Sequence, residues 1–328
     1  MLTKRENFLE TLRGGSPDRY VNQYDYMGVV MTPIGGDAYA RLRPGMSLKN
    51  DWGVTLTFQE GTPGPFPLLD DEHKVLHDVT MWKDVVKAPE TNLPDEAWGF
   101  TYGMMSQFDR NEVLITPMIA PGIFETVHYL MGMEDAMIAL YEEPEAMHDL
   151  IDYITEYEMR MAEQIVNRIH PDALFHHDDW GSHKSSFLSP EMFREFFLEP
   201  YKKIYGFYKD NGVQAIIHHN DAYSANLVPE MIEMGINVWQ GAVDTNNIPE
   251  LLKKYGPQLT IMGGLNNGKI DTPNWTPELV AAEVEKVCRE CGTKYFIPCL
   301  TQGMSGSTFP GVYECASENI DRMSKILF

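Results

Sequence analysis

Residues 214–223 read QAIIHHNDAY, an apolar run that ends abruptly in two histidines, an amide and a carboxylate. The run Val213–Ile217, broken only by one glutamine, is typical of a strand that is buried on both faces, as in a parallel sheet. Ser224 then begins an amphipathic helical pattern, SANLVPEMIEMG. We therefore expect His219 and Asp221 at the carboxyl end of a parallel strand, where α/β proteins bind their ligands.

A second stretch, Ala173–His183, repeats this pattern with the sequence ALFHHDDWGSH. A short apolar entry is again followed by imidazole and carboxylate groups. Such groups are typical of general acid–base catalysis, or of residues that orient a neighbouring histidine, and a polar turn is the alternative. The catalytic candidates in this stretch are His177, Asp178, Asp179 and His183.

Six further segments have the apolar pattern of strands, and most are separated from the next by a helical pattern. Alternation of strands and helices over 328 residues predicts an α/β fold, a (β/α)8 TIM barrel that forms one domain over residues 1–328. A doubly wound open sheet is the alternative, but no G-x-G-x-x-G follows a strand, as a dinucleotide-binding fold would require. The eight strands are expected to start at Tyr20, Gly53, Glu112, Ala173, Val213, Ile236, Leu259 and Tyr295.

The segment between the first expected strand, Tyr20–Met27, and Asn111 is irregular apart from Gly53–Phe58. Long segments of this kind are uncommon in a domain unless they are functional, so we predict an insertion that covers the barrel mouth and shapes a substrate site. Glu125, on the helix after PGIF, is a candidate substrate-binding carboxylate. An aromatic wall for a planar substrate is a further hypothesis, although each of its members also fits the core: Tyr24, Tyr26, Tyr102 and Trp239.

Charge and cysteine content narrow the class of protein. With 26 Lys+Arg against 48 Asp+Glu, the net charge of -22 disfavours nucleic acid and anionic membranes as partners. No apolar run approaches the roughly 18 residues of a membrane span. The four cysteines, none in a disulfide framework, indicate a reducing cytoplasm.

Three segments resemble uroporphyrinogen decarboxylase-like proteins: NFLETLRGGSPDR, PGIFETVHYLMGMEDAMIALYEEPEAMHDLIDYIT and DDWGSHKSSFLSPEMFREFFLEPYKKIY. The resemblance covers nearly the whole chain and implies a (β/α)8 barrel with its cleft at the carboxyl ends of the strands. One branch of the family removes carboxyl groups from a tetrapyrrole and carries an arginine-rich segment after the first strand. The corresponding segment here, YVNQYDYMGVVMTP, has no arginine, which disfavours a uroporphyrinogen decarboxylase.

The other branch transfers methyl groups to or from corrinoids, and it binds zinc through a His-x-Cys motif and a later cysteine. This resemblance implies metal ligands at His219, Asp221 and Cys299, although Asp221 could instead cap the following helix. The expected function is a zinc-dependent methyltransferase, or demethylase, that moves a methyl group from a small methoxy or methylamine compound to a corrinoid (cobalamin) on a partner protein. A non-catalytic tetrapyrrole-binding protein is a third alternative, and the sequence leaves open whether the chain forms a homodimer.

Overall fold

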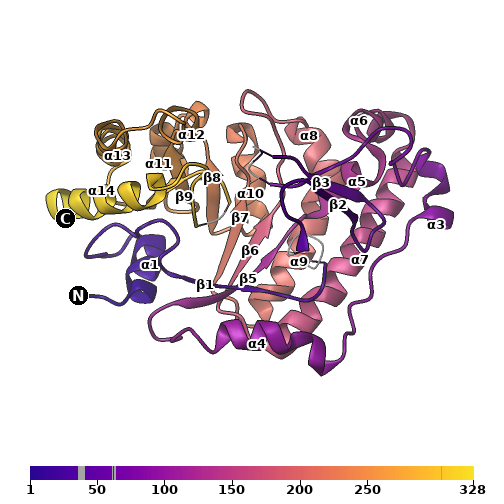
Figure 1. Cartoon of the computed structure of the whole chain (residues 1–328), viewed down its shortest axis with the longest axis horizontal. Helices are drawn as coiled ribbons and strands as arrows, with labels where there is room; N and C mark the ends of the chain where they lie inside the picture. The colour runs from indigo at the N-terminus through magenta and orange to yellow at the C-terminus, as the bar shows by residue number, and fades with distance from the viewer. Residues whose placement is uncertain (36–40, 61, 63, 304) are drawn as a thin grey trace.

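A curled sheet of seven parallel strands forms the centre of the computed structural model, which describes residues 1–35, 41–60, 62, 64–303 and 305–328 (Figure 1). The strand order is β1-β5-β6-β7-β8-β9-β10, so each strand lies beside its neighbour along the chain, apart from the insertion after β1. The α/β barrel predicted from the sequence is therefore confirmed. The bounds are β1 (Met27–Met31), β5 (Leu114–Ile119), β6 (Ala173–His177), β7 (Ala215–His219), β8 (Val238–Ala242), β9 (Thr260–Leu265) and β10 (Phe296–Leu300).

Helices cover the outer face of this sheet, and their ends follow the expected capping chemistry. Thr3 and Glu6 form a capping box on the first helix, which ends at Gly14 in a left-handed conformation. Thr276 caps the helix that begins with Pro277, where its side chain accepts from the backbone N–H of Leu279. The helices are α1 (Lys4–Arg13), α3 (Trp82–Val85), α4 (Gly99–Met105), α5 (Ile123–Met131), α6 (Met133–Glu142), α7 (Pro144–Ile169), α8 (Pro190–Phe193), α9 (Glu199–Asp210), α10 (Val228–Met234), α11 (Ile248–Tyr255), α12 (Asn267–Ile270), α13 (Pro277–Cys291) and α14 (Val312–Leu327), with short η1 (Val79–Met81), η2 (Asp95–Trp98), η3 (Arg194–Leu198), η4 (Ala225–Leu227) and η5 (Asp244–Asn246).

Strand residues alternate between two buried cores. One core lies inside the barrel and includes Phe175, Ile217 and Met262, and the other lies between the sheet and the helices. Phe8 of α1 enters the inner core, where its ring stacks on Tyr26 with centroids 3.9 Å apart. In the part of the chain that the structure describes, no helix is both long and apolar enough to cross a membrane.

The prediction of a strand at Tyr20–Met27 is wrong, because β1 begins only at Met27 and the residues before it form turns. This segment lies beside the free edge of β10, where the Gln23 side chain accepts a hydrogen bond from the backbone N–H of Leu300 at 3.2 Å. A side-chain oxygen thus occupies a position that a strand carbonyl would take. The aromatic alternation of Tyr24 and Tyr26 arises because both rings face the barrel interior, not because the backbone is extended.

The long insertion after the first strand is confirmed, but its own strand was assigned to the wrong sheet. The predicted strand at Gly53–Phe58 corresponds to β3 (Thr55–Phe58), which pairs with β2 (Met46–Lys49) and β4 (Phe66–Pro67) in a separate antiparallel sheet. Its short alternating pattern was compatible with either sheet. The barrel sheet of the described residues therefore has seven strands rather than the eight expected.

Candidate functional site

The register of β6 and β7 sorts their four histidines into two pairs. His176 lies opposite His218, and His177 lies opposite His219. Because successive side chains point to opposite faces of a sheet, one pair faces the helices and the other faces the barrel interior. The outward pair is held by Tyr205 of α9, whose hydroxyl lies 2.7 Å from His176 Nδ1 and 2.9 Å from His218 Nδ1.

Asp178 is fully buried and anchors the start of α5. Its carboxylate accepts hydrogen bonds from the backbone N–H groups of Phe124 and Glu125, both at 2.8 Å, and from the Tyr201 hydroxyl. Gly122 packs so closely that a Cβ there would stand 2.7 Å from Asp178. Asp178, expected to be catalytic, therefore lies behind the cleft, where it positions α5.

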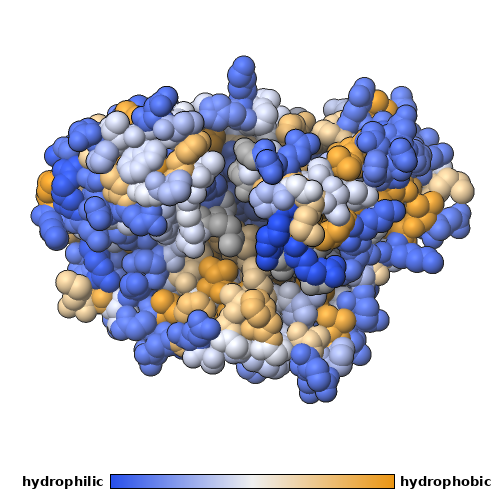
Figure 2. Space-filling model, in the orientation of Figure 1, coloured by the Kyte–Doolittle hydropathy of each residue, from blue (hydrophilic) through white to orange (hydrophobic). Residues whose placement is uncertain are grey.

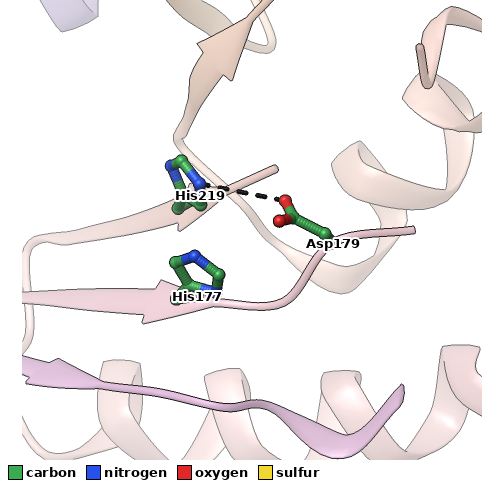
Figure 3. Close-up of side chains that lie close together, drawn as sticks. All are labelled: His177, Asp179 and His219. Carbon is green, nitrogen blue, oxygen red and sulfur yellow. Dashed lines mark ion pairs between the residues drawn. The ribbon is translucent and has the colours of Figure 1, made fainter. Parts of the chain in front are cut away.

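The inward pair joins Asp179 to form a group that can hold a metal ion. Each of His177, Asp179 and His219 offers one ligand atom, and these atoms lie within 4.8 Å of one another (Figure 3). His219 Nε2 is 3.8 Å from Asp179 Oδ1. His177 and His219 stack with ring centroids 4.3 Å apart. Two imidazoles and one carboxylate are a donor set that suits zinc and leaves a coordination position open.

Both imidazoles of this group are fixed through Nδ1. His177 Nδ1 lies 3.0 Å from Oε2 of Glu125, the carboxylate that Asp178 brings into place. His219 Nδ1 is hydrogen-bonded to Oε1 of Gln240 on β8. Because a carboxylate or amide oxygen accepts, Nδ1 of each ring carries the proton, and Nε2 is the nitrogen left for a ligand. This arrangement is typical of metal-binding histidines.

Burial and nearby charges shift the pKa values of the two histidines in opposite directions. Burial of His177 opposes its protonation, but the carboxylates of Glu125 and Asp179 outweigh it and raise the pKa of His177 to about 10. Burial, together with the charge on His177, lowers the pKa of His219 to about 4. Burial raises the pKa of Glu125, although His177 counteracts it. A metal ion would therefore compete with the proton on His177.

The other two expected metal ligands lie outside this group. Asp221 is exposed at the cleft rim, and its backbone N–H donates to Asp179 Oδ1 at 2.9 Å. It does not cap the following helix, because Asn246 Oδ1 accepts from the first N–H groups there. Cys299 is fully buried, with side-chain hydrogen bonds to Tyr24 and Gln240, and burial raises its pKa. Gln240 thus stands between this thiol and His219.

Of the remaining candidates, Glu125 alone joins the group directly. His183 is exposed and lies with Asp221 on a smaller neighbouring cavity of about 270 Å³. Trp239 is buried on the outer face, where Nε1 donates to the carbonyl of Asn220 at 2.9 Å. Tyr102 hydrogen-bonds to Arg168 in the last turn of α7, just before β6 begins, at the opposite end of the strands.

Two residues of the site escaped the sequence analysis. Gln240 comes directly after the apolar residues of β8, as the histidines do in β6 and β7. This position at a strand end was the sequence signal that could have marked it as a site residue. Gly303, in the loop after β10, packs on His219 so closely that a Cβ there would be 2.9 Å from the ring. Nothing in the local sequence marks this contact.

The group opens into a cleft of about 930 Å³ at the carboxyl ends of the strands. Figure 2 shows a hollow near the centre of the molecule, between the α11–α14 side and the β2–β4 sheet. Phe66 and Gly64 of the insertion line the cleft together with Glu125, His177 and His219. Among the described residues that line it, none is a lysine or an arginine.

The fold and this cleft define a class: a TIM-barrel protein with a candidate metal site at the carboxyl ends of its strands. The sequence model of the uroporphyrinogen decarboxylase (URO-D) family matches residues 49–322, so the chain belongs to that family. No curated protein matches the sequence significantly.

Two solved structures are similar to this chain, and the first of them shares its fold. A methyltransferase from Methanosarcina mazei is 12% identical, with 98% of this chain and 99% of that chain covered and a TM-score of 0.66. A B12-independent methionine synthase from Shewanella sp. W3-18-1 is 13% identical, with coverages of 74% and 68% and a TM-score of 0.46.

Proposed function

We propose that this protein is a zinc-dependent methyltransferase, which moves a methyl group from a small methoxy or methylamine compound to a corrinoid carried by a partner protein. The observation that carries the proposal is the group of His177, Asp179 and His219, with each imidazole fixed at Nδ1 by a side-chain oxygen. The structurally similar protein from Methanosarcina mazei is a methyltransferase, which supports the same activity.

The residues present fit a zinc ion by their chemistry. Nε2 of His177, Nε2 of His219 and a carboxylate oxygen of Asp179 would hold it. Bound there, zinc would act as a Lewis acid on the oxygen or nitrogen that carries the methyl group. Glu125 and Gln240 keep the two rings in place, and the backbone N–H of Asp221 holds Asp179 at 2.9 Å. The cleft of about 930 Å³ has room for the donor and for the face of a corrinoid.

The first test is the zinc content of protein purified without chelators, measured by elemental mass spectrometry. We expect about one zinc per chain in the wild type, and loss of zinc in His177→Ala, Asp179→Asn and His219→Ala. Cys299→Ser and Asp221→Asn test the ligands that the sequence alone suggested. Both variants should retain zinc if His177, Asp179 and His219 hold the ion. His183→Ala is the matched control, since this histidine is exposed and outside the group. Absence of metal from the wild type would refute the proposal.

The second candidate is a porphyrinogen decarboxylase, which the description of the family favours. Its substrate carries several carboxylates, and burying each next to Glu125, Asp179 and Asp221 without a cation would be costly. The missing basic residues on the described cleft wall therefore argue against it. Tight binding of uroporphyrinogen by the metal-free protein, detected by absorbance, would favour the decarboxylase over the methyltransferase. Turnover of the bound compound would then distinguish a decarboxylase from a non-catalytic binding protein.

A further inference from the structure

A second, apolar cavity adjoins the cleft. Its volume is about 400 Å³, and it lies between the start of the insertion, β1, β5 and α7. Methionine, isoleucine and aromatic side chains make up most of its wall: Met31, Ile34, Trp52, Phe100, Ile119 and Met161, with Tyr157 beside them. We call this cavity the apolar compartment.

Hydrogen bonds and ring packing hold one wall of the compartment. Trp52 sits in a tight turn in which Asn50 Oδ1 accepts from the N–H groups of Trp52 and Val54, both at 3.0 Å. The indole packs edge-on against Tyr157 of α7, with ring centroids 4.9 Å apart and planes at 77°. Trp52 and Tyr157 are only 8% and 5% exposed, so this wall is held by packing on both sides.

The compartment and the metal cleft share a wall. Met118, Ala120 and Pro121, at the carboxyl end of β5 and just beyond it, line both cavities. A molecule can therefore have one end beside the His177–Asp179–His219 group and its other end in the compartment. Hydrophobic residues also gather below the central hollow in Figure 2.

Size and charge limit what fits. An apolar cavity of roughly 150 Å³ is enough for benzene, so the compartment has room for a substituted ring, whereas methanol or methylamine would leave it empty. No lysine or arginine is among the described residues that line either cavity, and Asp51, Glu125 and Asp179 are carboxylates. An anionic group inside the compartment would lose its hydration and meet no basic side chain among the described residues of its wall.

We propose that the apolar compartment binds the body of the methyl donor, and that this donor is a neutral compound of about one aromatic ring, an aryl methyl ether being the simplest example. The proposal rests on the methyltransferase function above and names its substrate class. The heteroatom and its methyl group would face the metal cleft, while the ring lies between Trp52 and Met161. A carboxylate on the ring is disfavoured, because it would lie in the compartment, where the described wall has no basic side chain.

The test measures binding without turnover. Anisole is titrated into metal-free protein, in the absence of any corrinoid, by calorimetry or ligand-observed NMR. We expect saturable binding, and at least tenfold weaker binding of 4-methoxybenzoate. Met161→Trp fills the compartment and should weaken anisole binding at least tenfold. Met159→Trp is the control, because Met159 lies on the same helix but does not line the compartment.

A second variant keeps the test decisive if Met161→Trp fails to fold. Trp52→Ala removes the aromatic wall and should also weaken anisole binding severalfold, with circular dichroism and zinc content as checks on folding. No saturable binding of anisole, or equal binding by wild type and both compartment variants, would overturn the proposal.

Methyl transfer to cob(I)alamin separates this proposal from the proposed function. Anisole binding that the variants abolish, without methyl transfer from any donor, would refute the methyltransferase and leave the compartment as a binding site. Transfer from methanol or methylamine at the same rate in wild type and Met161→Trp, without transfer from anisole, would support the methyltransferase and overturn the donor class.

Discussion

Gln240→Leu is the most informative single change, because it removes the side-chain amide and nearly conserves volume. Gln240 is fully buried, and its Oε1 is the acceptor for Nδ1 of His219. Leucine would leave that N–H without a partner inside the protein, at a cost of about 1–3 kcal/mol. Loss of such a partner to a metal-binding histidine typically lowers metal affinity by roughly 10- to 100-fold, which is about 1.4–2.8 kcal/mol. The first figure concerns the stability of the folded protein and the second its affinity for zinc.

Competition with a zinc-chelating indicator at pH 7.5 measures this loss directly. Gln240→Glu is the matched control, because it restores an acceptor oxygen and copies what Glu125 does at His177. We expect the leucine variant to bind zinc at least tenfold more weakly and the glutamate variant to bind as tightly as wild type or more tightly. Equal zinc affinity in Gln240→Leu and wild type would refute the role of this hydrogen bond, and equal losses in both variants would point to packing instead.

Three further predictions concern the surroundings of the site. Gly303→Ala should lower zinc affinity about tenfold with little change in thermal stability, because its Cβ would stand 2.9 Å from the His219 ring; unchanged affinity would mean that the loop moves aside freely. Asp178→Ala should destabilise the protein by about 2–4 kcal/mol in urea unfolding, since α5 loses its cap, whereas Asp179→Ala should not. Burial raises the pKa of Asp25 to about 6, so the folded protein keeps this proton to higher pH than the unfolded chain and loses stability as the pH rises from about 4 to 6. Asp25→Asn should therefore be more stable than wild type at pH 7.5, by at most about 3 kcal/mol, and equally stable at pH 4; thermal melts at the two pH values would contradict this if the gain were the same at both.

The fold was predictable where strand and helix patterns are local. β6 and β7 contain the apolar runs and end at His177 and His219, and the capping residues of α1 and α13 mark the starts of these helices. The prediction of a strand at Tyr20–Met27 was wrong because side chains that fill a barrel can alternate in the sequence without an extended backbone. β3 misled because a short strand carries no sign of the sheet it joins.

The site was predictable only in part, because coordination depends on register. The sequence marked both strand ends but could not tell which histidine of each pair faces inward. That choice depends on the alignment of β6 with β7, which sets His177 beside His219. The resemblance directed attention to Asp221 and Cys299, two and eighty residues beyond His219 in the chain, whereas Asp179 comes from the neighbouring loop. A contact between neighbouring strands has no fixed spacing in sequence.

The composition of the group bears on which methyl donors it suits. Asp179 supplies a carboxylate oxygen, and the described group contains no thiolate, because Cys299 is buried behind Gln240 with its pKa raised. Oxygen and nitrogen ligands donate less charge than sulfur, so an ion held by them would remain a stronger Lewis acid. Asp179 and Glu125 are two carboxyl groups beside the site, and with both ionised they would balance a divalent ion without a third anion. A neutral oxygen or amine donor would preserve that balance, whereas a thiolate would exceed it. We therefore expect exogenous thiols to inhibit methyl transfer rather than accept the methyl group, and measurable methylation of an added thiol would contradict this reasoning.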